Sequence, residues 1–159
     1  MAEEKEIKQA QVAFQTLCEM LDEKDWHYTK DNDNFSISCG AQGDDLPMEI
    51  NIQTDPERQI VILLSQLPFS IPEDKRIDVA LAVSAINYAI VDGSFDYDFT
   101  SGRLLFRMTS SFRESLIGKD VFEYMLLVSC KTIDDYNDKL LMIIKNKMSL
   151  EDLVKFINE

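Results

Sequence analysis

The sequence predicts an α+β protein, in which helices pack on one side of an antiparallel sheet of five to six strands. Apolar residues repeat at helical spacing near both ends of the chain, and short runs of alternating apolar and polar residues lie between them. The alternating runs follow one another without the long crossovers that parallel strands need. We therefore expect the order α-β-β-β(-β)-α-β-β-α-α, folded as one domain over residues 1–159.

The first helix is expected from Glu3 to Glu23. Its apolar residues recur every three or four positions, with Glu, Gln and Lys between them, so they form one stripe that faces a core. This stripe consists of Ile7, Ala10, Phe14, Leu17, Cys18 and Leu21.

Up to four strands follow the first helix. A short strand is expected at 26–29. Two more are expected at 35–39 and 48–53, where apolar and polar residues alternate, so that each strand has one buried and one solvated face. The next run is apolar at every position from Ile60 to Leu64, which predicts a strand with cover on both faces.

The second helix is expected over Glu73–Val91. Pro72 suits its first turn, the acidic residues behind Pro72 suit the positive end of the helix dipole, and Gly93 can provide a left-handed cap at the other end. The helix has two apolar faces, whereas a helix resting on a sheet needs one. One face consists of Val79, Val83, Ile86 and Ile90, and the opposite face consists of Ile77, Leu81 and Tyr88.

The second apolar face requires a cover besides the sheet. We expect a homodimer whose partner-binding surface is the face formed by Val79, Val83, Ile86 and Ile90. In the alternative, the C-terminal helix of the same chain covers that face. Either way, the second helix is expected to lie between the sheet and a second layer.

A β-hairpin is expected after this helix, with Ser101-Gly102 as a two-residue loop. This loop pairs Phe99 with Leu104 and places Asp96 opposite Arg107. Because the apolar residues of both strands then share one face, the carboxylates belong to the solvated face.

Two helices are expected after the hairpin. Apolar residues at helical spacing predict a long helical segment over 118–147. The sequence "SLED", which begins at Ser149, resembles a capping box and predicts a short final helix.

The chain is acidic, with 29 Asp and Glu against 16 Lys and Arg and a formal net charge of −13. Such a chain repels phosphate backbones, so no nucleic acid binding is expected. The acidity either serves solubility or attracts basic partners. The N-terminus lacks an apolar signal-peptide core and the longest apolar run is too short to span a bilayer, so we expect no membrane association and a cytoplasmic location.

No residues have a spacing typical of a catalytic or metal site, so we expect a protein that is not an enzyme and uses no cofactor. His27 is the only histidine, and no neighbour in the sequence supplies an orienting partner or further metal ligands. The three cysteines lie far apart and form no C-x-x-C pair, which argues against a disulfide framework and a thiolate zinc site. We therefore expect them to be small buried residues. The alternative is a small metal- or ligand-binding enzyme that uses the Asp92, Asp96 and Asp98 cluster, or Cys39 as a nucleophile.

The segments "SIPEDKR" and "AINYAIVDGSFDYDFTSGRLLFRMTSSF" resemble the YbjN-type family, whose members are labelled as bacterial sensory transduction regulators. The family pattern is an Asn late in the second helix, then Gly-x-Phe-x-x-Asp, and then a hairpin with a glycine turn and an Arg-containing strand. The matching residues are Asn87, Gly93, Phe95, Asp98, Gly102 and Arg107. The family is similar in fold to type III secretion chaperones. This resemblance implies a small dimeric protein that binds a protein client, and it implies no catalytic residues.

Overall fold

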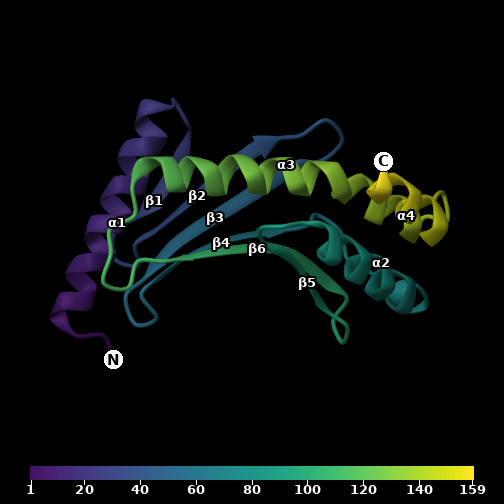
Figure 1. Ribbon diagram of the computed structural model, residues 1–159, viewed down its shortest axis with the longest axis horizontal. Helices are drawn as coiled ribbons and strands as arrows, with labels where there is room; N and C mark the ends of the chain where they lie inside the picture. Colours follow the sequence, from purple (N-terminus) through teal and green to yellow (C-terminus); the bar gives the residue numbers. More distant parts are fainter.

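The computed structural model describes all 159 residues of the chain. Four α-helices and six strands alternate in the expected order (Figure 1). In chain order the elements are α1 (Glu4–Glu23), β1 (Tyr28–Asp31), β2 (Ser36–Gln42), β3 (Pro47–Asp55), β4 (Ile60–Gln66), a 3₁₀ turn (Glu73–Lys75), α2 (Arg76–Ala89), β5 (Ser94–Asp98), β6 (Arg103–Ser111), α3 (Lys119–Ile144) and α4 (Leu150–Asn158).

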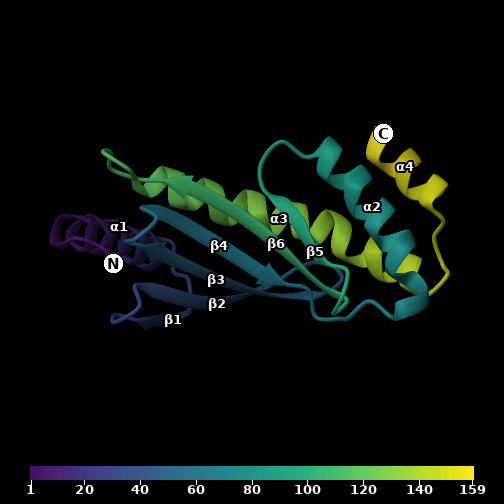
Figure 2. The same cartoon turned by 90° about the horizontal axis from the view of Figure 1, so that it is seen from below.

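The strands form a single antiparallel sheet in the order β1-β2-β3-β4-β6-β5. Helices α1 and α3 lie on one face of this sheet (Figure 1), and α2 and α4 lie together at its β5 end. Seen from below, the strands lie in front of α3, and no helix covers them on this side (Figure 2). The predicted α+β fold, with helices on one side of an antiparallel sheet, is therefore confirmed.

A continuous core of 33 buried apolar residues fills the space between the sheet and the helices. The α1 stripe contributes Phe14, Leu17 and Leu21 to this core, as its spacing predicts. The two covering helices are also joined at the surface, because Lys119 at the start of α3 contacts Glu23 of α1 at 2.5 Å.

Helix α2 ends two residues earlier than predicted, at Ala89. Ile90 has extended backbone angles, so Gly93 does not cap the helix. Gly93 instead has a φ of +76°, and a Cβ there would lie 2.3 Å from the Phe106 ring. Gly93 therefore allows the chain to pass close to Phe106 of β6, where a residue with a Cβ would clash.

The hairpin register differs from the prediction by two residues. Phe95 pairs with Phe106 and Asp98 pairs with Arg103, so the loop contains four residues and Asp96 faces Leu105. A two-residue shift keeps every side chain on its predicted face, because the side chains of a strand alternate with a period of two. The hydrophobic pattern therefore fits both registers equally well.

The turn itself sets this register. The Asp98 carboxylate accepts hydrogen bonds from the backbone N–H of Thr100 at 3.0 Å and from the Ser101 hydroxyl at 2.5 Å. Gly102 then takes a φ of +75° and donates its N–H to the Asp98 carbonyl at 2.8 Å. These bonds close a four-residue turn that a two-residue loop could not form.

The final helix begins as predicted. The Ser149 hydroxyl accepts a hydrogen bond from the Asp152 N–H at 3.1 Å, and the Asp152 carboxylate accepts the Ser149 N–H at 3.3 Å. This reciprocal pair is the predicted capping box.

Candidate protein-binding surfaces

The residues expected to bind a partner lie on the inner side of α2, where the helix packs against β5, α3 and α4. Val79 and Ile86 have no exposed surface, Val83 is 6% exposed, and Ile90 is partly buried. The chain itself therefore buries this face, and α4 contributes to its cover as the alternative expected. Because buried side chains are not available to a second molecule, the surface that α2 offers to a partner is the opposite one.

That opposite surface, which we call the outer face of α2, consists of Ile77, Leu81 and Tyr88. Their exposed fractions are 67%, 54% and 95%. The sequence predicts that both sides of α2 are covered, whereas this side is exposed to solvent in the single chain. No charged residue lies between Asp78 and Asp92, so no charge interrupts this surface from Leu81 to Tyr88.

The three carboxylates of the alternative metal site, Asp92, Asp96 and Asp98, each interact with another side chain of the hairpin or of α3. Asp92 accepts a hydrogen bond from a tyrosine hydroxyl of α3, and Asp96 forms an ion pair with Arg107 at 2.8 Å. The hydroxyl of Ser101 and the backbone N–H groups of the turn lower the pKa of Asp98 by hydrogen bonding to its carboxylate. No group of three His, Cys, Asp or Glu side chains is arranged to hold a metal ion.

The candidate nucleophile Cys39 lies on β2 with 5% of its surface exposed. Burial raises the pKa of its thiol to about 11, which keeps the thiol protonated and weakly reactive near neutral pH. His27 and Cys39 border the same shallow depression. However, the Cys39 side chain faces the helices, and no hydrogen bond joins the two residues. This geometry provides no activated nucleophile.

The uncovered side of the sheet is a surface that sequence analysis did not identify. We call it the open face. Most of its side chains are uncharged and come from five strands: Thr29, Ser36, Ser38, Asn51, Gln53, Ile62, Leu64 and Thr109, with the charged residues Asp31, Glu49 and Arg107 beside them.

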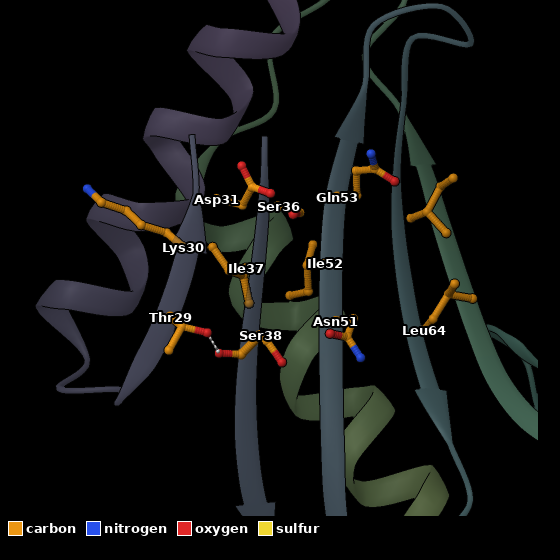
Figure 3. Close-up of a pocket in the computed structure, with 11 residues that line it drawn as sticks. Thr29, Lys30, Asp31, Ser36, Ile37, Ser38, Asn51, Ile52, Gln53 and Leu64 are labelled. Atoms are coloured by element: carbon orange, nitrogen blue, oxygen red, sulfur yellow. Dashed lines mark hydrogen bonds between the residues drawn. The ribbon is translucent and has the colours of Figure 1, made fainter. Parts of the chain in front are cut away.

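The strand register arranges these side chains in two rows across the sheet. One row runs Thr29–Ser38–Asn51–Leu64–Arg107, and the other runs Asp31–Ser36–Gln53–Ile62–Thr109. Side chains of both rows line a shallow hollow of about 380 Å³ (Figure 3). Leu64 is 36% exposed there, and the Asn51 amide makes no hydrogen bond within the chain. The hollow therefore offers both apolar contact and free hydrogen-bonding groups.

The apolar run from Ile60 to Leu64 led to the expectation of cover on both faces of β4. Val61 and Leu63 do pack into the core, whereas Ile62 and Leu64 point to the side without a helix. The expected second cover is therefore missing. Aliphatic side chains that remain accessible beside polar residues on a sheet face are typical of a surface that another molecule contacts.

Comparisons by sequence identify no relative. No family model matches the chain, and no curated protein matches it. None of the helices combines the length and the apolar character needed to cross a bilayer.

Comparisons by structure identify proteins of the same fold. YbjN from E. coli, described as a candidate transcription regulator, matches with a TM-score of 0.55 and 12% identity over 83% of this chain and 89% of its own. A chain of the HopA1–SchA chaperone–effector complex matches with a TM-score of 0.51 and 14% identity, covering 78% and 91% of the two chains. A chain of the ExsC–ExsE complex matches with a TM-score of 0.51 and 12% identity, covering 77% and 91%.

These likenesses concern the fold, because identities of 12–14% are too low to carry residue roles from one protein to another. At that level they confirm the resemblance to YbjN and to type III secretion chaperones that the hairpin motif indicated.

Proposed function

We propose that the protein is a non-enzymatic binding module, chaperone-like or regulatory, that binds a segment of a partner protein on the open face. The observation that carries this proposal is the uncovered sheet, where Leu64 is exposed and Ile62 is partly exposed beside polar side chains. A sheet face without a helix exposes apolar area that gains free energy when a partner covers it. The fold shared with chains of chaperone–effector complexes supports a protein as the partner.

Site-specific photo-crosslinking in the native cell tests this proposal. A photoreactive amino acid in place of Leu64 should crosslink a partner protein. The same amino acid in place of Lys131, which is exposed on α3, should not. The additional change Ile62→Gln should reduce the yield at position 64, because it removes aliphatic contact area. Absence of a product at position 64, or equal products at both positions, would contradict the proposal.

We also propose a homodimer that forms through the outer face of α2. Ile77, Leu81 and Tyr88 form an apolar stripe along one helix, and a two-fold axis would place this stripe against its own copy. The segment from Val79 to Val91 carries no charge, so two copies of a chain with a net charge of −13 can approach each other there with little local repulsion.

Light scattering at micromolar concentration tests the homodimer. We expect wild type to be dimeric and Leu81→Asp to be monomeric, because the new carboxylate would be buried at the interface. Leu127→Asp on α3 is the matched control, since Leu127 is 52% exposed and Leu81 is 54% exposed. A monomeric wild type would end the proposal.

A further inference from the structure

Carboxylates that form no ion pair lie at both ends of strands β1 to β3. Asp31 and Asp33 lie at the turn between β1 and β2. Asp44 and Asp45 lie in the loop between β2 and β3, and Glu49 follows on β3. Because the strands are antiparallel, the turn and the loop lie at opposite ends of the sheet.

The surface between these ends is neutral. Strand β2 contains no charged residue over its seven residues, Ser36–Gln42, and separates the two acidic ends by roughly 20 Å at about 3.3 Å per residue. This distance exceeds the Debye length of roughly 8–10 Å at physiological salt, so each end acts on a bound molecule separately. On strands β1 to β3 the open face is therefore a neutral strip with carboxylates at each end, while Arg107 of β6, which forms an ion pair with Asp96, lies opposite Leu64.

We propose that the segment bound on the open face is extended, carries small or aliphatic uncharged side chains in its centre, and has lysine or arginine residues at both ends. The proposal rests on the proposed function and adds the chemistry of the partner. A neutral strip of roughly 20 Å accommodates about six extended residues. Basic residues beyond these six would then lie beside the carboxylates at each end.

The polar groups of the strip favour an extended segment over a helix. The Asn51 amide has no partner within the chain, and the hydroxyls of Ser36 and Ser38 point to the same side of the sheet (Figure 3). An extended segment has backbone N–H and C=O groups free to bond these side chains, whereas a helix uses its own internally.

Charge also decides between candidate occupants. A second copy of this chain would bring a net charge of −13 against carboxylates, and nucleic acid would bring phosphates against them. A basic-ended segment of another protein is attracted by the same carboxylates.

Fluorescence anisotropy with three labelled peptides tests the proposal. The probe is Lys-Lys-Val-Thr-Val-Thr-Val-Thr-Lys-Lys. One comparison peptide has Glu in place of every Lys, and the other has Ser in place of every Val. At low salt we expect the probe to bind about tenfold more tightly than the Glu peptide and about threefold more tightly than the Ser peptide, and the first difference should shrink at high salt.

Variants of the protein show whether the carboxylates at the two ends of the strip attract the basic ends of the probe. The triple change Asp33→Asn, Asp44→Asn and Asp45→Asn should weaken binding of the probe by at least about threefold. The matched control removes the same number of charges far from the open face, through Asp120→Asn on α3 together with Glu151→Gln and Glu159→Gln at α4. We expect the control to bind the probe like wild type.

Three outcomes would overturn this proposal: no binding of the probe, equal binding of the Lys and Glu peptides, or equal effects of the two triple variants. The crosslinking at position 64 separates this failure from that of the proposed function. A crosslinked partner segment without basic ends would leave the proposed binding function standing, but it would contradict the proposal that the segment has lysine or arginine at both ends.

Discussion

Asn87 of α2 pairs with the backbone of Phe95 of β5 through both of its amide groups. Its Oδ1 accepts the Phe95 N–H at 2.8 Å, and its Nδ2 donates to the Phe95 carbonyl at 2.9 Å. β5 is an edge strand, so this side chain supplies hydrogen bonds that a further strand would otherwise make. The pairing explains why an Asn late in the second helix accompanies the Gly-x-Phe sequence in the motif.

We predict that Asn87→Ala lowers the free energy of unfolding by about 1–3 kcal/mol, because it leaves a partly buried N–H and C=O at Phe95 without partners. Urea denaturation provides the measurement. Asn51→Ala on the open face removes the same side chain where it makes no hydrogen bond in the chain, and should change stability by less than about 0.5 kcal/mol. Similar losses for the two variants would show that the Asn87 pairing is not stabilising.

Gly102 closes the hairpin turn against the segment that precedes α2. Its carbonyl accepts the Ile71 N–H at 2.8 Å, and a Cβ on Gly102 would lie 2.3 Å from the Ile71 carbonyl oxygen. We predict that Gly102→Ala lowers the free energy of unfolding by about 1–3 kcal/mol, through this overlap and the strain of its positive φ.

Gly40→Ala is the control for Gly102→Ala. A Cβ on Gly40 would lie 3.8 Å from the Met48 carbonyl oxygen, which is an ordinary contact. We expect this change to be neutral or to stabilise by up to about 1 kcal/mol, because glycine weakens a strand interior. Thermal melting of both variants measures the difference, and a Gly102→Ala variant as stable as Gly40→Ala would refute the predicted strain.

The sequence predicts which residues form strands and which side of each strand is buried, because alternating apolar residues can point to only one of the two faces of a sheet. In β2 and β3, Ile37 pairs with Ile52 and Cys39 pairs with Ile50, and all four face the helices. The hairpin register could not be read from the same pattern, because a shift of two residues preserves it. Hydrogen bonds from the turn to Asp98 decide that register, and they depend on geometry that residue types alone do not specify.

The candidate surfaces were harder to predict than the fold. Both sides of α2 are apolar, so composition could not show that Val83 lies inside and Leu81 outside; that choice depends on where β5, α3 and α4 meet the helix. The apolar run of β4 likewise could not show that one face lacks cover. Its polar neighbours Asn51 and Gln53 were the available signal, since they mark a solvated face.

The two sides of α2 predict opposite responses to a new charge. Val83→Asp should lower the free energy of unfolding by about 3 kcal/mol or more, because the carboxylate would be buried without a partner. Leu81→Asp should keep the folded circular dichroism spectrum, because that side chain is exposed. Val83→Ala, with an expected loss of about 2 kcal/mol, gives a measurable value if the Asp variant does not fold. Tolerance of Asp at position 83 would show that the inner face of α2 is not buried.

The buried thiol of Cys39 and the partly buried thiol of Cys130 predict a loss of stability at alkaline pH. Burial raises the pKa of Cys39 and of Cys130 to about 11 each, above the value of about 8.5 for an unfolded cysteine. A group whose pKa is raised by folding contributes its full stability below the unfolded pKa and loses it as the pH rises through the folded pKa. We therefore expect the contribution of these thiols to be constant below about pH 8.5 and to fall between there and about pH 11. Denaturation of the wild type and of the double variant Cys39→Ala/Cys130→Ala at a series of pH values measures that contribution.

At pH 8 a thiol-reactive dye should label Cys39 far more slowly in the native protein than in urea. Equal labelling rates would show that Cys39 is accessible, and would restore it as a candidate nucleophile.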